Sequence, residues 1–267
     1  MKPALLGACA AFTFGTMALA PAPLAAQAHD HAHAAAATTP AIPAAITAAL
    51  ADPKRPKADV DRDAARHPGE LLAFAGIKPG MRVADVMMGG GYFTRILAAT
   101  VGPQGKVYGY QAAEFIGFRP AYGDEQKAVV AAYPAVVPVN MALAEIAFPE
   151  KLDAIITVQN YHDLHLGNFP PDLAATVGKR LYDALKPGGT LLVVDHVANT
   201  DPGFTVPAKL HRIDPAAARA EIEKAGFTFA GESKLLADPA DPHDKNVFDP
   251  AIRGKTDQFV YLFRKPS

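Results

Sequence analysis

The chain has 267 residues, half of them hydrophobic, and its 26 basic and 27 acidic residues leave a formal net charge of −1. This composition suits one globular α/β domain and predicts no electrostatic attraction to nucleic acid. The single cysteine, Cys9, excludes a disulfide within the chain.

The first 28 residues have the pattern of a secretory signal peptide. Lys2 precedes an apolar, alanine-rich run from Ala4 to Ala20, and Ala26-Gln27-Ala28 supplies the small residues of a cleavage site. The run is too short for a convincing membrane-spanning helix. We therefore expect cleavage after Ala28, export to the periplasm, and a mature chain that lacks cysteine and does not insert into a membrane.

The next stretch, residues 29–58, is rich in alanine, proline and histidine and is predicted to be a linker with one short helix, Ile42 to Leu50. The folded domain is predicted to span residues 59–267. Its first helix, Asp59 to Ala75, is interrupted at His67-Pro68-Gly69.

Residues 82–101 read as a strand, a glycine turn and a helix. The strand, Arg82 to Met87, is apolar inside except for Asp85, as expected for a strand covered on both faces. Gly89-Gly90-Gly91 follows, and such a turn lets a ligand lie against bare backbone. The helix from Tyr92 to Val101 is stopped by Gly102.

Strands and helices alternate through the rest of the domain, which predicts a parallel sheet with helices on both faces. Further strands are predicted at 106–110, 136–139, 152–158, 190–195, 227–232 and 258–264, with helices at 124–132, 171–185 and 214–225. No helical pattern separates the last two strands, so the final strand is expected to return antiparallel. We predict a doubly wound, mostly parallel seven-stranded α/β sheet with a C-terminal antiparallel strand.

Three motifs resemble those of the class I S-adenosylmethionine-dependent methyltransferases. They are Gly80–Asp85 with the three glycines, Leu152–Ile156, and Leu185-Lys186-Pro187-Gly188-Gly189. Within that superfamily the chain is similar to a bacterial group of exported proteins predicted to be methyltransferases, through Asn160-Tyr161-His162-Asp163 and Lys255-Thr256-Asp257. The resemblance covers about residues 70–265. It implies a Rossmann-like methyltransferase fold and S-adenosyl-L-methionine as the cofactor.

The resemblance also implies which residues bind the cofactor. Asp85 and the glycine turn would hold its methionine part. Gln111 and Asn140 stand where the family commonly has acidic residues for the ribose and the adenine. The predicted cofactor-binding residues are Asp85, Gly89, Gly90, Gly91, Gln111, Asn140 and Asn160.

Five histidines fall in loops at the carboxyl edge of the predicted sheet, where open α/β sheets bind ligands. We predict His162 as a general base oriented by Asp163, with Tyr161 beside them. The predicted substrate or lid residues are His165, His196, His211, His243 and Lys255. No metal ligands are assigned, because the histidine spacing is not that of a preformed site. Metal binding and purely structural hydrogen bonding remain alternative interpretations of these loops.

The sequence thus predicts methyl transfer from S-adenosylmethionine to a small molecule that it does not identify. The main alternative is a non-catalytic extracytoplasmic protein that binds a small molecule or a metal on the same fold. A nicotinamide-dependent oxidoreductase is disfavoured by Lys186-Pro187-Gly188-Gly189 and by the neutral Gln111 after the second strand. No nucleic-acid partner is expected, and the oligomeric state stays open.

Overall fold

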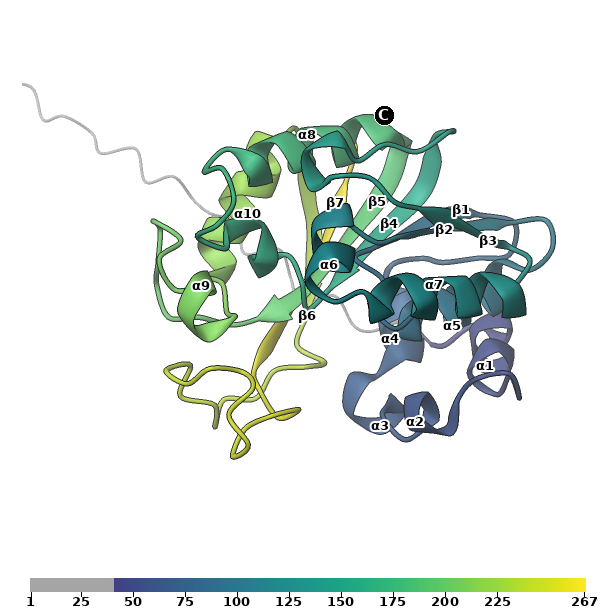
Figure 1. The fold of residues 1–267 in the computed structure, drawn as a ribbon, viewed down its shortest axis with the longest axis horizontal. Coiled ribbons are helices and arrows are strands. Elements are labelled where there is room, and N and C mark those ends of the chain that lie inside the picture. The colour runs from purple at the N-terminus through teal and green to yellow at the C-terminus, as the bar shows by residue number, and fades with distance from the viewer. Residues whose placement is uncertain (1–40) are drawn as a thin grey trace, which may run out of the picture. The chain divides into compact units, whose positions relative to one another are not determined.

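A seven-stranded sheet forms the centre of the described part of the chain, residues 41–267, in the computed structural model (Figure 1). Its strands lie in the order β3-β2-β1-β4-β5-β7-β6. β1 to β5 run parallel, and β7 is antiparallel to both β5 and β6. The predicted fold class is therefore confirmed. The strands are β1 (Arg82–Val86), β2 (Lys106–Tyr110), β3 (Val136–Val139), β4 (Leu152–Val158), β5 (Leu185–His196), β6 (Thr228–Ser233) and β7 (Gln258–Arg264).

Helices cover both faces of the sheet, because successive strand residues point to opposite sides. In β1, Val83 belongs to one buried cluster and Ala84 to the other. The first cluster includes residues of α1 (Ala44–Leu50), α4 (Pro68–Phe74), α5 (Tyr92–Val101) and α7 (Ala121–Ala132). The second includes residues of α8 (Leu173–Ala184) and α10 (Pro215–Lys224). The shorter helices are α2 (Lys57–Val60), α3 (Asp63–Arg66), α6 (Ala113–Phe118), η1 (Leu143–Glu145), η2 (His162–His165) and α9 (Pro207–Leu210).

Local sequence sets the ends of the long helices. Asp214 Oδ1 accepts a hydrogen bond from the backbone N–H of Ala216 at 2.8 Å, and Pro215 takes the first position of α10. Helix α5 begins after Gly91 and is followed by Gly102, whose φ is 64°. Both helices lie where the sequence predicts them.

The Lys186-Pro187-Gly188-Gly189 segment lies in the first turn of chain after α8, within the amino end of β5, and has a structural role there. Gly188 has a φ of 76°, and a β carbon on Gly189 would lie 2.9 Å from the carbonyl oxygen of Lys186. Lys186 Nζ also contacts Asp153 Oδ1 at 2.5 Å. Because this turn is ordered against β4, β5 begins at Leu185, earlier than the predicted start at residue 190.

The predicted linker, residues 29–58, requires a correction in its second half. Ile46 and Ala49 of α1 are buried in the same cluster as α5, and Arg55 pairs with Asp63 at 2.6 Å. Composition suggested a linker, but one face of this alanine-rich helix packs on the domain. The predicted short helix is confirmed as α1. The predicted signal peptide and the start of the linker, residues 1–40, lie outside the described residues.

Within residues 41–267, no helix is both long enough and apolar enough to cross a membrane.

Candidate active site

A cavity of about 1200 Å³ opens at the carboxyl edge of the parallel strands. The strand order reverses between β1 and β4, and doubly wound sheets bind ligands in the crevice at such a point. Loops after β1, β2, β4 and β5 line the cavity, together with α6, α7 and the N-terminal α2–α3 region. The sequence-predicted residues that line it are Asp85, Gly89, Gly90, Gln111, Asn160, His162, Asp163, His196 and His211.

The glycine turn presents backbone to one side of this cavity. The backbone N–H of Gly89 donates to Gln111 Oε1 at 2.9 Å, so the buried Gln111 side chain fixes the turn. Gly89 and Gly90 line the cavity, whereas Gly91 does not. A β carbon on Gly91 would lie 2.5 Å from Val129 Cγ2, so this glycine allows α5 to pack against α7. The predicted ligand-contacting role of Gly91 is thus replaced by a packing role.

Asp85 lies beneath the turn at the end of β1 and is 4% exposed. Its Oδ2 accepts a hydrogen bond from Thr94 Oγ1 at 2.6 Å. Burial raises the pKa of Asp85 to about 6, although the Thr94 hydroxyl and the nearby Arg66 charge oppose the rise. Arg66 lines the cavity too, over the ring of Tyr92 at 4.3 Å, and it donates to Gln159 Oε1 at 3.1 Å.

The two predicted asparagines differ in position. Asn160 Nδ2 donates to the carbonyl oxygens of Val86 and Met87 at 3.2 and 3.0 Å, and its Oδ1 accepts from Thr157 Oγ1. It therefore ties the ends of β1 and β4 together at the cavity. Asn140 Nδ2 instead donates to the carbonyl oxygen of Gln111 at 3.2 Å, and the residue does not line the cavity. A cofactor contact through Asn140 is not supported.

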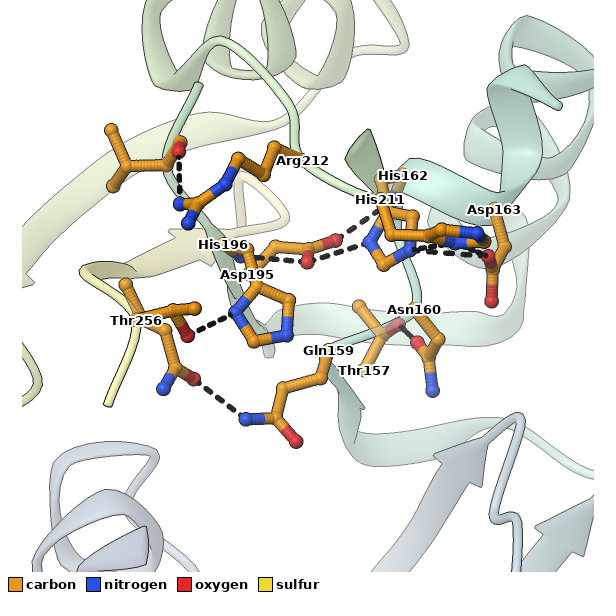
Figure 2. Close-up of polar contacts among 12 residues, drawn as sticks. Thr157, Gln159, Asn160, His162, Asp163, Asp195, His196, His211, Arg212 and Thr256 are labelled. Atoms are coloured by element: carbon orange, nitrogen blue, oxygen red, sulfur yellow. Dashed lines mark hydrogen bonds and ion pairs between the residues drawn. The ribbon is translucent and has the colours of Figure 1, made fainter. Parts of the chain in front are cut away.

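His162 is held between carboxylates on two sides (Figure 2). Its Nδ1 lies 2.8 Å from Asp195 Oδ1, and its Nε2 lies 3.2 Å from Asp163 Oδ1 and 3.3 Å from His211 Nδ1. Burial lowers the pKa of His162, but the Asp195 and Asp163 carboxylates outweigh it and raise the pKa to about 10. Asp195, which makes the shorter contact, therefore orients the ring rather than Asp163. With a pKa of about 10, His162 is protonated at neutral pH and is not free to accept a proton.

Two other histidines reach the cavity. His196 Nδ1 lies 2.7 Å from Thr256 Oγ1, and burial lowers the pKa of His196 to about 4, which keeps it neutral. His211 follows α9 with a φ of 53°, and its ring packs against Phe248 at 4.9 Å between centroids. His196 is the last residue of β5, and His211 lies in the segment after α9, at the edge that the sequence predicted.

The remaining predicted residues do not line the cavity. Tyr161 and His165 turn toward α10, where both contact Glu221, at 2.7 and 3.0 Å. The ring of His165 also stacks on Phe204 at 3.8 Å. Tyr161 therefore lies outside the cavity lining, and its predicted catalytic role has no support from its position. The residues outside the cavity lining are Gly91, Asn140, Tyr161, His165, His243 and Lys255.

Several residues of the site were not among the sequence predictions. Glu114 follows β2, and its carboxylate oxygens accept from the backbone N–H of Leu143 at 3.0 and 3.2 Å. Asp195 lies near the end of β5, which pairs with β4. The predicted adjacency of these two strands was enough to expect Asp195 close to His162. Phe118 of α6 also lines the cavity and is 86% exposed. Its role could not be predicted from the sequence, because single exposed apolar residues are common in proteins.

The comparisons with known proteins identify the fold. No protein-family model and no curated protein matches the sequence. A SAM-dependent methyltransferase from Aquifex aeolicus is 21% identical, with a TM-score of 0.54 over 78% of this chain and 95% of its own. An arsenic(III) S-adenosylmethionine methyltransferase from Chlamydomonas reinhardtii is 19% identical, with a TM-score of 0.53 over 85% of this chain and 75% of its own.

A third similar structure, that of the cyclase SpnF, is 15% identical, with a TM-score of 0.54 over 80% of this chain and 85% of its own. The chain therefore has the fold of the class I S-adenosylmethionine-dependent methyltransferases. Because the same fold occurs in a protein described as a cyclase, the reaction must be argued from the site.

Proposed function

We propose that this protein transfers a methyl group from S-adenosylmethionine to a small-molecule acceptor. The observation that carries the proposal is the cavity itself. Its lining includes bare glycine backbone, a buried carboxyl, and His162 with Asp163. The glycines and the carboxyl suit a cofactor with an amino-acid tail, and His162 and Asp163 offer polar contacts to an acceptor.

The residues on the cofactor side fit S-adenosylmethionine. A volume of about 1200 Å³ is larger than the roughly 300–1,000 Å³ of common ligand pockets, so a second molecule has room beside the cofactor. Gly89 and Gly90 would let the methionine part approach the backbone, and Asp85 lines the same cavity. Glu114 brings an acidic side chain to the end of β2, and its oxygens have lone pairs left for ribose hydroxyls.

S-adenosylmethionine supplies an electrophilic methyl group on its sulfonium. The chain's own contribution is mainly alignment, because transfer requires the acceptor atom, the methyl carbon and the sulfur to lie in line. Asp195 fixes His162, and Asn160 fixes the ends of β1 and β4, so both walls of the cavity are held by hydrogen bonds. His162 and Asp163 line the same cavity and would contact an acceptor there.

Calorimetry of the mature protein with S-adenosylmethionine and S-adenosylhomocysteine tests the proposal. We expect both to bind at a single site. Absence of binding at millimolar concentrations of both would refute it and favour a non-catalytic binding protein on the same fold.

We further propose that the protein acts outside the cytoplasm after removal of residues 1–28, which follows from the signal-peptide pattern. The intact mass of the protein recovered from the periplasm should correspond to a chain that begins at His29. Recovery of the uncleaved chain from the cytoplasm alone would contradict this.

A further inference from the structure

We propose that His162, Asp163 and His211 form a zinc site in the wall of the cavity. Three potential ligand atoms face one another there, namely His162 Nε2, Asp163 Oδ1 and His211 Nδ1 (Figure 2). Asp163 Oδ1 lies 3.2 Å from His162 Nε2 and 3.8 Å from His211 Nδ1, and the two histidine nitrogens are 3.3 Å apart.

These separations match the size of a zinc ion. A point equidistant from three atoms with these separations lies about 2.0 Å from each, which is the usual length of a Zn–N or Zn–O bond. Tetrahedral ligands at that bond length are separated by about 3.3 Å, close to the observed distances. No large side-chain movement is needed for an ion to enter.

The chemistry of the donor set favours zinc over the common alkaline-earth ions. Two imidazoles and one carboxylate suit a borderline-soft divalent metal, whereas Mg²⁺ and Ca²⁺ prefer oxygen ligands. All three side chains line the cavity. Three protein ligands leave a fourth position, and in zinc enzymes that position takes water or substrate.

The surroundings of His162 support this assignment. Asp195 Oδ1 accepts from His162 Nδ1 at 2.8 Å, which directs Nε2 toward Asp163 and His211. Such a carboxylate behind a histidine is the usual outer shell of a zinc ligand. The backbone N–H groups of His162 and His196 donate to the same carboxylate at 2.8 and 2.7 Å, so it is itself fixed.

The two facing histidine nitrogens also need a proton or a cation between them. Two neutral imidazole nitrogens at 3.3 Å repel one another through their lone pairs unless a proton or a cation lies between them. Asp163 adds negative charge at the same point. A divalent ion satisfies all three atoms at once.

The role of the ion rests on the proposed function. All three ligands line the cavity, so a molecule in the cavity could supply the fourth ligand, and the acceptor would then carry a hydroxyl or thiol group that binds zinc. The ion would hold that group in place and favour its deprotonated form.

The site can be tested by metal titration without any assay of activity. His29, His31 and His33 at the mature N-terminus could bind metal by themselves, so all three are changed to alanine in the parent protein. After treatment with EDTA, the parent is titrated with Zn²⁺ by calorimetry and with Co²⁺ by visible absorption. We expect one ion per chain and cobalt bands typical of tetrahedral coordination.

Two variants remove a ligand, and one serves as the control. His211→Ala and Asp163→Ala should each weaken zinc binding by at least about 100-fold, because even outer-shell changes cost 10–100-fold. The His211 side chain is 27% exposed, so its removal should not prevent folding, which circular dichroism will check. His243→Gln changes a histidine outside the cavity lining and should bind zinc as the parent does.

Absence of zinc binding by the parent, or equal affinity in folded His211→Ala, would overturn the site. Binding of S-adenosylmethionine is measured separately on the EDTA-treated parent. A chain that binds zinc but not S-adenosylmethionine refutes the proposed function and supports the site, whereas the opposite result refutes the site alone.

Discussion

The carboxylate of Asp195 binds both the backbone and the ring of His162. Its Oδ2 accepts a hydrogen bond from the backbone N–H of His162 at 2.8 Å, and its Oδ1 accepts one from the ring Nδ1 of His162 at 2.8 Å. β4 and β5 are parallel neighbours, with Val158 paired to Val194, so the residues that follow this pair in each segment meet at the same edge. One buried carboxylate thus fixes the loop and the side chain that the proposed chemistry depends on.

Replacing Asp195 with alanine should reduce the free energy of unfolding by about 3 kcal/mol or more, because the buried donors of His162 lose their acceptor. Urea denaturation measures this loss. Asp183→Ala is the matched control, since its ion pair with Lys179 has side chains that are 55% and 62% exposed. The Asp183→Ala change should lower the free energy of unfolding by less than about 0.5 kcal/mol. Equal losses in the two variants would contradict the structural role of Asp195.

Gly91→Ala should destabilise the fold even though Gly91 does not line the cavity. The residue has a φ of 82°, and the added β carbon would lie 2.5 Å from Val129 Cγ2. We expect a loss of about 2 kcal/mol from backbone strain and overpacking. Gly117→Ala in α6 is the control, because nothing lies within 4 Å of its β-carbon position. That change should be neutral or stabilising by up to about 1 kcal/mol, and thermal melts compare the two.

The sheet was predictable because its signals are local and periodic. Apolar runs mark the strands, Pro215 and Gly102 mark helix ends, and the absence of a helical pattern before β7 predicts its antiparallel return. The edge of the sheet that carries the site followed from the same pattern. The packing of α1 was not predictable, since an alanine-rich segment has little amphipathic contrast.

The direction of each loop side chain was not predictable, because loops lack a period. His162 and His165 lie in the same short helix η2, yet His162 lines the cavity and His165 contacts Glu221 of α10. Gln111 has the position expected for a ribose contact, but its side chain binds the N–H of Gly89. Such roles depend on neighbours that only the folded chain brings together.

Gly90→Val should weaken binding of S-adenosylmethionine without unfolding the protein. A β carbon at Gly90 would meet Glu125 Oε2 at 3.5 Å, which is an ordinary contact, but the larger side chain would enter the cavity beside the turn. We expect at least a tenfold increase in Kd, or about 1.4 kcal/mol, by calorimetry. Lys255→Ala, outside the cavity lining, should leave Kd unchanged. Unchanged binding in Gly90→Val would place the cofactor elsewhere.

The buried carboxyl of Asp85 should make stability fall as the pH rises. Its pKa is raised from 3.8 to about 6 in the folded chain, because burial disfavours the charged form. Between these two values the folded state binds more protons than the unfolded state, so this residue's contribution to stability declines across that window and stays low above it. Two pKa units correspond to about 3 kcal/mol.

Asp85→Asn should remove this component. In urea denaturation without cofactor, the unfolding free energy of the parent minus that of Asp85→Asn should fall by about 2.4 kcal/mol between pH 4 and pH 7.5. Carboxylates common to both proteins cancel in this difference. Thr94→Val removes the 2.6 Å hydrogen bond that favours the charged form of Asp85, so the pKa of Asp85 should rise further. The stability of Thr94→Val should therefore fall more steeply with pH than that of the parent. Parallel pH profiles for the parent and Asp85→Asn would mean that Asp85 titrates as it does in the unfolded chain.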